Sequence, residues 1–328
     1  MPAITVANPL VLPRIDAVPA GSTDRTIDRI VSSQHVVEGA GFEVWRPFPA
    51  NGSGGGSGGV DSHTADPFFL LDQLGPVEYG PNEAVGAPWH PHRGCETVTY
   101  IIDGVVEHHD SNGGGGIIGE GDTQWMTAGS GILHDEVPTQ TFFRNGGRTH
   151  GVQLWVNLPA RLKFTPPRYQ AIEASQLTLL SSADGGALVR LIAGSLGGHD
   201  GPGVTHTPIS YAHASISPTA QLRVPWPAEF SAMVYVLSGH GFVGAAQRPI
   251  GAHELAVFGA GDAITVAAAA DQPEDSPNLE VLLLGGLPIR EPIVHYGPFL
   301  MNTRQEILDA LDDFEHGRMG VIPATTVA

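Results

Sequence analysis

The sequence contains little that would cross-link the chain or insert it into a membrane. Its single cysteine, Cys95, excludes an internal disulfide framework and favours a reducing cytoplasm. The longest apolar runs, such as residues 281–289, are too short to span a bilayer. Residues 1–13 lack an early positive charge, and prolines break their short apolar stretch, so we expect no secretory signal. These features together favour a cytoplasmic location.

Positive charge is also scarce in this chain. The 16 Lys and Arg residues are outnumbered by 34 Asp and Glu residues, which gives a formal net charge of −18 at pH 7. A surface of that sign repels phosphate backbones, and the basic residues are scattered singly rather than gathered into a stripe. The sequence therefore argues against direct binding of DNA or RNA, whereas protein partners and small-molecule ligands stay open.

Aromatic residues make up only 7% of the chain, while 43 glycines and 27 prolines suit short strands joined by tight turns. Alternating or β-branched segments bounded by turn residues recur along the sequence and favour an all-β fold. These segments are residues 97–102, 149–156, 187–192, 232–237 and 279–284. A length of 328 residues is about twice that of a usual single domain, so we expect two domains.

Two further segments have clear local signals. The Gly-Ser run at residues 51–59 cannot bury a core, and it predicts a flexible surface loop. Near the C-terminus, Thr303 and Glu306 have the spacing of a helix capping box, and Gly317 stands where a helix would end. An apolar stripe lies between these signals at Ile307, Leu308, Leu311 and Phe314. We expect this helix to close one of the barrels.

The two halves of the sequence resemble each other. Residues 99–104 are similar to residues 234–239, and the turn at residues 119–122 is similar to the turn at residues 259–262. Duplication of one barrel accounts for both the length and the repetition. The prolines within residues 159–167 indicate where the two halves join.

Two pairs of residues carry the candidate chemistry. Side chains at i and i+2 of a strand point to the same face, so His90 and His92 offer two imidazoles to one side of a sheet. His134 and Glu136 offer an imidazole and a carboxylate in the same way. If the barrel places the two segments side by side, four ligands converge on one metal ion.

The same parity argument sorts the neighbouring residues. His108 and His109 are adjacent, so they face opposite sides of a strand, and we interpret the remaining histidines as surface or core residues. The inner face that His90 and His92 share would also carry three residues downstream, unless a bulge near Gly94 shifts the phase. These three residues are Val98, Tyr100 and Ile102.

The repeat supplies an internal comparison for the metal site. At a constant offset between the halves, Pro225 and Pro227 stand where His90 and His92 stand in the first half. Proline has no side-chain atom that could bind a metal. The second barrel is therefore predicted to be metal-free.

Long stretches of the sequence resemble the pirin family of bicupins. The resemblance is strongest in residues 90–100 (HPHRGCETVTY) and residues 121–136 (GDTQWMTAGSGILHDE). Residues 66–72 (DPFFLLD), residues 75–76 and residues 297–303 (GPFLMNT) are similar to that family too. Position 95 carries Cys where Phe is more usual, which affects packing behind the site rather than a ligand.

The resemblance implies two cupin-type β-barrels, of which the N-terminal one holds iron through three histidines and a glutamate. Those ligands fall on His90, His92, His134 and Glu136. The implied division is an N-terminal extension at 1–26, a metal-binding cupin domain at 27–160, and a metal-free cupin domain with the closing helix at 161–328. Glu96 is a rival ligand, since general cupins take their carboxylate from about this position and its parity matches that of the histidine pair.

The resemblance also implies an activity, a quercetin 2,3-dioxygenase-like opening of a flavonol ring with O₂. Three imidazoles and one carboxylate suit a divalent first-row metal, with Fe(II) expected and Mn, Ni, Cu or Zn as alternatives. Glu136 would serve as both ligand and catalytic base. An alternative class of function is an iron- or redox-sensing regulatory protein that acts through protein partners, and a third is a cupin whose metal only stabilises the barrel.

Overall fold

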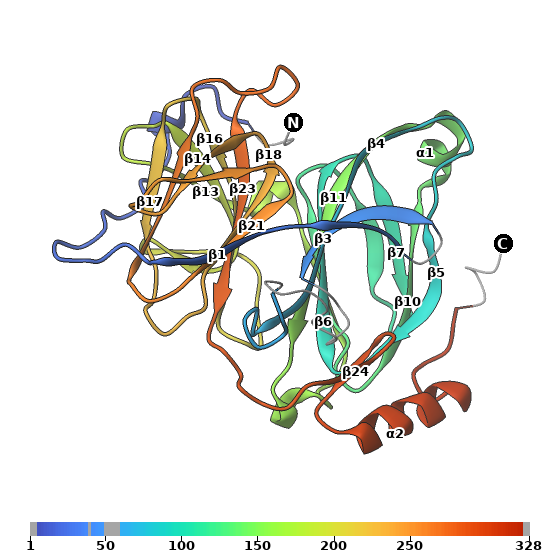
Figure 1. Ribbon diagram of the computed structural model, residues 1–328. Coiled ribbons are helices and arrows are strands. Elements are labelled where there is room, and N and C mark those ends of the chain that lie inside the picture. The colour runs from blue at the N-terminus through green and yellow to red at the C-terminus, as the bar shows by residue number, and fades with distance from the viewer. Residues whose placement is uncertain (1–4, 39–40, 49–59, 324–328) are drawn as a thin grey trace.

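The chain forms two β-barrels that lie side by side, with a helix near the C-terminus (Figure 1). The computed structural model describes residues 5–38, 41–48 and 60–323, so the Gly-Ser run at residues 51–59 lies outside the described residues. The predicted all-β fold with two cupin-type barrels and a C-terminal helix is confirmed. No helix in the described part of the chain is long and apolar enough to cross a membrane.

The first barrel consists of a seven-stranded and a four-stranded sheet, and all of their strand pairs are antiparallel. The larger sheet has the order β12 (Arg168–Ile172), β9 (Thr123–Thr127), β6 (Cys95–Asp103), β11 (Gly147–Asn157), β4 (Phe68–Tyr79), β3 (Phe42–Phe48) and β2 (Gln34–Glu38). The smaller sheet has the order β5 (Ala87–His92), β10 (Ile132–Pro138), β7 (Val106–Asp110) and β8 (Gly115–Ile118).

The second barrel repeats this arrangement. Its larger sheet has the order β1 (Ile27–Ser32), β21 (Glu254–Phe258), β18 (Met233–Ser238), β23 (Leu279–Gly286), β16 (Ile209–Ile216), β14 (Ala187–Leu196) and β13 (Thr178–Ser181), with β15 (His199–Asp200) beside β14. Its smaller sheet has the order β17 (Gln221–Pro225), β22 (Ala263–Ala268), β19 (His240–Val243) and β20 (Arg248–Gly251). The shared strand order supports a duplicated barrel.

The strand pairing corrects the predicted alignment of the two halves. By sheet order, β17 and β22 are the counterparts of β5 and β10. The inward-facing pairs to compare are His90 with His134 and His92 with Ile132 in the first barrel, and Leu222 with Val266 and Val224 with Ile264 in the second. Leu222 therefore corresponds to His90 and Val224 to His92, while Arg223 and Pro225 lie on the other face of β17. A metal-free second barrel stays a prediction.

The constant offset was wrong because the connections differ in length. Residues 226–232 join β17 to β18, whereas only residues 93–94 join β5 to β6. The two turns that look alike in the sequence also precede strands that do not correspond. Residues 119–122 precede β9, whereas residues 259–262 precede β22, which is the counterpart of β10.

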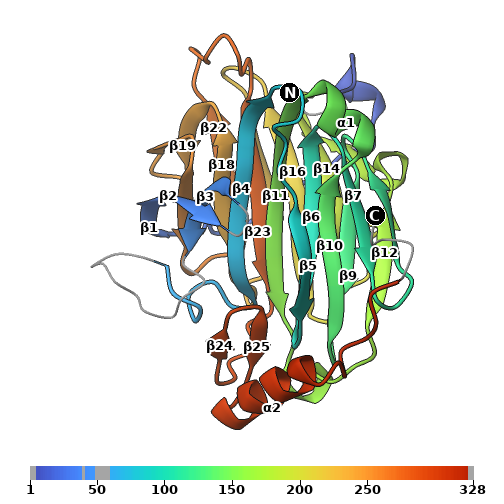
Figure 2. The same ribbon diagram turned by 90° about the vertical axis from the view of Figure 1, so that its right-hand side faces the viewer.

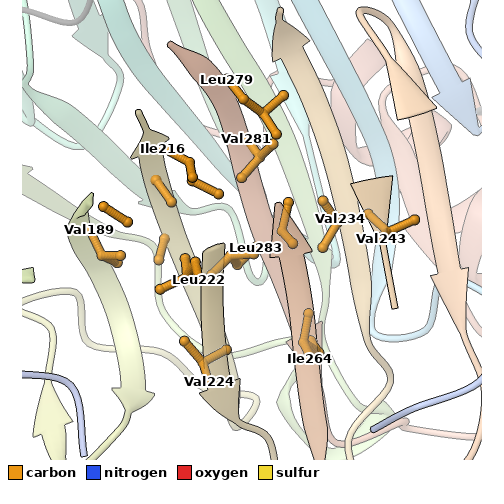
Figure 3. Packing of buried hydrophobic residues seen from close by; sticks show 14 of the residues in the cluster. Val189, Ile216, Leu222, Val224, Val234, Val243, Ile264, Leu279, Val281 and Leu283 are labelled. Atoms are coloured by element: carbon orange, nitrogen blue, oxygen red, sulfur yellow. The ribbon is translucent and has the colours of Figure 1, made fainter. Parts of the chain in front are cut away.

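The interiors of the two barrels differ in polarity. In the second barrel, apolar side chains from both sheets fill the interior, among them Val234, Val243 and Leu283 (Figure 3). In the first barrel, Thr99 of β6 and Gln124 of β9 bond to Glu136 of the facing sheet. Only the first of these interiors is therefore built around polar side chains in the described residues.

A third core lies between the barrels. It joins Val98 and Tyr100 of β6 to Tyr211 and Tyr235 of the second barrel. The sequence pattern predicted that these β6 residues face the inside of their own barrel, and that prediction was wrong. Gly94 explains the change of phase. Its φ is +81°, and a Cβ there would collide with the carbonyl oxygen of Leu300. The alternation of side chains between the two faces is therefore interrupted between β5 and β6.

The two ends of the chain cross to opposite barrels. β1 pairs with β21 of the second barrel. The C-terminal hairpin, made of β24 (Val294–Tyr296) and β25 (Phe299–Met301), and helix α2 (Arg304–Glu315) lie at one end of the first barrel (Figure 2). The Leu300 N–H donates to the Arg93 carbonyl at 3.1 Å, and the Arg93 guanidinium pairs with Asp313 at 2.7 Å. The domain boundaries after residues 26 and 160 stay predictions.

Helices are few in the described residues. Helix α2 begins with the predicted capping box between Thr303 and Glu306. The sequence patterns did not indicate the other helical segments, which are α1 (Gln140–Asn145) and the 3₁₀ turns Pro9–Val11, Ala160–Leu162 and Ala174–Gln176.

Candidate metal centre

Three of the four predicted ligands meet inside the first barrel. β5 and β10 are antiparallel neighbours, and His90 lies directly opposite His134 in their register. His92 joins them from the same face of β5, and one ring nitrogen from each of the three imidazoles lies within 4.8 Å of the others. His92 and His134 are buried, while His90 is half-buried at the wall of a cavity.

In His90 and His92 the Nδ1 atom faces a backbone carbonyl, so Nε2 is the ring nitrogen that is left for an ion. Nδ1 of His90 lies 2.7 Å from the Pro88 carbonyl, and Nδ1 of His92 lies 3.2 Å from the Pro298 carbonyl. A carbonyl oxygen only accepts a hydrogen bond, so these Nδ1 atoms carry the protons and leave Nε2 with a lone pair. Outer hydrogen bonds of this kind fix the tautomer of metal-binding histidines.

The third histidine, His134, has a buried ring nitrogen that a metal ion could bind. His134 Nε2 is buried and has no hydrogen-bond partner among the residues that the structure describes. Burial, followed by the nearby histidines, holds the pKa values of His92 and His134 well below the ordinary histidine value, so both imidazoles are neutral. Three imidazoles that converge on one point are a donor set that divalent first-row metals prefer, and the residues present therefore fit such an ion.

Glu136 lies in the wall of the same cavity but outside the three-histidine group. Its Oε1 accepts hydrogen bonds from Thr99 Oγ1 at 2.8 Å and from Gln124 Nε2. Its Oε2 accepts a hydrogen bond from Gln153 Nε2 at 3.0 Å. Three donors from β6, β9 and β11 thus orient the carboxylate. Its role as a metal ligand stays a prediction.

The rival carboxylate, Glu96, points elsewhere. The break at Gly94 turns it to the face of β6 that packs between the barrels, where Thr127 Oγ1 donates to its Oε1 at 2.7 Å. Burial raises the pKa of Glu96 despite hydrogen bonds that lower it. Among the described residues, Glu96 is not part of the histidine group.

A cavity of about 710 Å³ opens beside the three histidines. Its walls are mostly apolar, and the larger apolar side chains that line it include Phe42, Leu70, Leu74, Tyr79, Ile101, Phe142 and Trp155. Trp155 packs edge-on against the His92 ring, with 4.8 Å between the ring centroids. The cavity can therefore hold an aromatic molecule in contact with the histidine group.

Cys95 lies behind this wall and does not line the cavity. It is completely buried with Phe69, Leu70, Trp155 and Leu300. Burial raises the pKa of its thiol to about 12, so it behaves as a small apolar side chain.

The sequence reasoning missed several residues of the site. His108 was expected only to face the opposite side of its strand from His109, and the structure places it completely buried beside His134. The family-like segment at residues 297–303 had no assigned role, and the structure shows that it supplies the Pro298 carbonyl to His92. Thr99, Gln124 and Gln153 carried no signal of their own, because neutral polar residues in strands are common.

Comparison with known proteins agrees with the geometry. Residues 55–156 match the family model for Pirin, and residues 211–320 match the model for the Pirin C-terminal cupin domain. The chain is 41% identical over 253 residues to a Pseudomonas aeruginosa protein provisionally named as a quercetin 2,3-dioxygenase, which covers 77% of this chain and 86% of that protein. It is 35% identical over 299 residues to Pirin of Homo sapiens, covering 90% and 94% of the two chains.

A solved structure extends the comparison to the whole fold. The crystal structure of a quercetin 2,3-dioxygenase from Acinetobacter baumannii matches with a TM-score of 0.81 at 35% identity, and the match covers 92% of this chain and 100% of that chain. Because both barrels are matched and the relatives align over most of their own length, this chain is a member of the pirin family.

Proposed function

We propose that this protein is a metal-dependent dioxygenase that opens the ring of quercetin or a related flavonol with O₂. The observation that supports it best is the convergence of three imidazole nitrogens beside a cavity of about 710 Å³ with Glu136 in its wall. Mainly apolar cavities of this size with a few convergent polar groups are typical of sites for drug-sized ligands. The names of the Pseudomonas and Acinetobacter proteins point to the same chemistry.

In this proposal His90, His92, His134 and Glu136 hold one divalent metal. We propose Fe(II), with Mn, Ni, Cu or Zn as alternatives that the same donor set accepts. When bound, such an ion would polarise the flavonol 3-hydroxyl and make its proton easier to remove. Neutral histidines suit this role because metal binding requires unprotonated ligand atoms.

Glu136 is the proposed base. Its carboxylate would accept the proton of the 3-hydroxyl, and hydrogen bonds from Thr99, Gln124 and Gln153 keep the carboxylate aimed into the cavity. To serve also as a ligand, Glu136 would have to exchange at least one of these hydrogen bonds for the ion. The apolar wall, including Trp155, would pack on the flat rings of the substrate and exclude water from them.

Oxygen uptake tests the proposal. We expect the Fe(II)-loaded protein to consume O₂ when quercetin is added and to release carbon monoxide as the ring opens. Metal-free protein prepared with a chelator is the control, and it should consume none. Failure of stoichiometrically loaded protein to consume O₂ with quercetin and with other flavonols would contradict the proposal.

The alternative hypothesis is an iron- or redox-sensing protein that acts through protein partners, and the third is a metal that only stabilises the barrel. Both predict a loaded protein that does not turn over flavonols. The same oxygen-uptake measurement therefore separates them from the dioxygenase. The cytoplasmic location also stays a prediction.

A further inference from the structure

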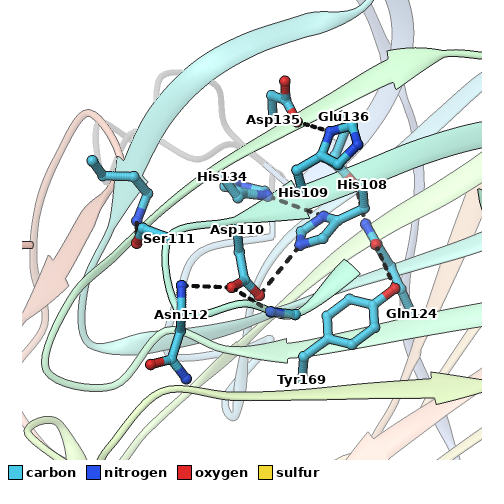
Figure 4. A network of polar contacts seen from close by, with 12 residues as sticks. His108, His109, Asp110, Ser111, Asn112, Gln124, His134, Asp135, Glu136 and Tyr169 are labelled. Atoms are coloured by element: carbon cyan, nitrogen blue, oxygen red, sulfur yellow. Dashed lines mark hydrogen bonds and ion pairs between the residues drawn. The ribbon is translucent and has the colours of Figure 1, made fainter. Parts of the chain in front are cut away.

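Three buried side chains form a line that leads outward from His134 (Figure 4). His108 Nδ1 lies 3.4 Å from His134 Nδ1, and His108 Nε2 lies 3.7 Å from Asp110 Oδ2. β7 carries His108 and Asp110, and its pairing with β10 places Asp110 directly opposite His134. The residues are 0%, 0% and 2% exposed in the order His134, His108 and Asp110, so water does not compete for their polar atoms.

The proton positions along this line follow from Asp110. Its Oδ1 accepts hydrogen bonds from the backbone N–H groups of Asn112 at 2.8 Å and Gly114 at 2.9 Å. These two donors fix Oδ1 and leave Oδ2 to face His108. Neither Asp110 Oδ2 nor His108 Nε2 has a hydrogen-bond partner elsewhere in the described residues, so each is the nearest complement of the other.

A carboxylate only accepts hydrogen bonds, so its neighbour His108 Nε2 carries the proton. His108 Nδ1 then has a lone pair, which accepts the Nδ1–H of His134. With its proton on Nδ1, His134 presents an unprotonated Nε2 to the other two histidines, as a metal ligand must. Asp110 thus influences the proton position on His134 through the His108 ring that lies between them.

The packing around His108 holds this arrangement in place. The ring of Tyr169 stacks on His108, with 5.0 Å between the centroids and 25° between the planes. Gly114 closes the turn over Asp110, because a Cβ at this position would collide with Asp110 Oδ2. Tyr169 of β12 thus restricts the His108 ring, and the β7–β8 connection restricts the Asp110 carboxylate.

We propose that Asp110, acting through His108, is a positioning residue that fixes the tautomer of His134 in which Nε2 is free to bind a metal. The role of His134 as a ligand rests on the proposed function above. The tautomer itself can be measured in the metal-free protein, so failure of the one is distinguishable from failure of the other.

Asp110→Asn is the decisive change. Its side-chain oxygen should stay on the N–H groups of Asn112 and Gly114, which directs the new NH₂ group toward His108 Nε2. His108 would then accept at Nε2 and carry its proton on Nδ1, where it opposes the Nδ1–H of His134. His134 relieves that conflict by moving its proton to Nε2, the atom that the metal needs.

Two measurements report this change. Long-range ¹⁵N NMR of the metal-free protein with labelled histidine distinguishes protonated from unprotonated ring nitrogens, and we expect His134 to exchange its Nδ1–H for an Nε2–H in Asp110→Asn. The affinity for Co(II), measured by its visible absorption, should fall by about 10–100-fold, the usual effect of losing an outer hydrogen-bond partner of a metal ligand.

The controls use neighbouring residues. Asp135→Asn makes the same chemical change one residue from His134, but Asp135 bonds to His109 Nδ1 at 2.9 Å on the other face of β10, so both measurements should stay at wild-type values. His108→Asn keeps an acceptor near the Nδ1 position and removes the link to Asp110. In that background Asp110→Asn should have little further effect, because the two residues act as one unit.

Thermal unfolding of each metal-free variant shows whether the barrel still folds. An unchanged His134 tautomer in a folded Asp110→Asn variant would overturn the proposal. So would an unchanged Co(II) affinity in that variant, or an equal loss of affinity in Asp135→Asn. If the wild-type protein binds no Co(II), the proposed metal centre fails, whereas the NMR comparison still decides the role of Asp110.

Discussion

The side chain of Lys163 ties together three parts of the first barrel, and its substitution gives a quantitative prediction. Lys163 is the only lysine in the sequence and is completely buried. Its Nζ donates to the Gly94 carbonyl at 2.8 Å, to Asn157 Oδ1 at 2.7 Å and to the Leu300 carbonyl at 2.7 Å. The last bond fastens the C-terminal hairpin, whose Pro298 carbonyl orients His92.

Lys163→Met keeps the approximate shape and removes all three donors. Each buried acceptor left without a partner is worth about 1–3 kcal/mol of lost stability. Burial lowers the pKa of Lys163 from 10.5 to about 8, so the folded state carries a penalty of about 3 kcal/mol for the charge, which the variant no longer has. The loss from three unpaired acceptors is larger than the gain from removing the buried charge. We therefore expect the variant to be less stable by about 3 kcal/mol at pH 7.

The pH dependence gives a sharper test. Between pH 7 and pH 9.5 the folded protein loses the Lys163 proton while the unfolded chain keeps it, so the unfolded state binds more protons and stability rises with pH. The lowered pKa corresponds to a gain of about 2 kcal/mol for the wild type over this range. Lys163→Met lacks the group, so its disadvantage should grow by the same amount.

Urea unfolding of the metal-free proteins at the two pH values measures the difference, with Arg161→Met as the control for loss of an exposed cation nearby. Because the chain has one lysine, ¹³C-lysine labelling gives a single side-chain Cε signal whose titration reports the folded pKa directly. A folded pKa near 10.5, or a stability gap that does not change with pH, would refute the reasoning.

Four further outcomes test the site and the second barrel. Replacing both His90 and His92 by Ala should remove the roughly one metal per chain expected in purified protein, and metal analysis that still finds it would contradict the ligand assignment. Glu136→Gln should keep most of the metal while flavonol turnover falls by about a hundredfold or more, the usual contribution of a positioned base. Glu96→Gln should change turnover much less; if it instead strips the metal, the carboxylate ligand has been misassigned. Crystals soaked in excess metal should show no ion inside the second barrel.

The parts of the site that could be predicted are those written into single strands. The i, i+2 period of a strand placed His90 and His92 on one face, and the structure brings them to His134 as expected. The capping box of Thr303 and Glu306 is equally local and was found. Such patterns need only the geometry of one backbone segment.

The sequence pattern could not predict which face a side chain occupies once the chain has passed from one strand to the next. Glu96 and Val98 have the parity of the histidines, yet both face away from them, because Gly94 adopts a positive φ that no periodic rule registers. The repeat alignment failed for a similar reason, since the connection after β17 is longer than the one after β5, and Leu222 and Val224 rather than Pro225 and Pro227 occupy the inward-facing positions.

The sequence by itself determined the all-β duplicated fold, the family and the two short motifs that carry the histidines, because periodicity and motif spacing are properties of neighbouring residues. Only the tertiary structure decided what surrounds those histidines. The His92 partner, Pro298, lies 206 residues away, and His108 reaches His134 only because β7 pairs with β10. Hydrogen-bond partners that fix a ring are chosen by the register between strands, and that register depends on how the whole barrel closes.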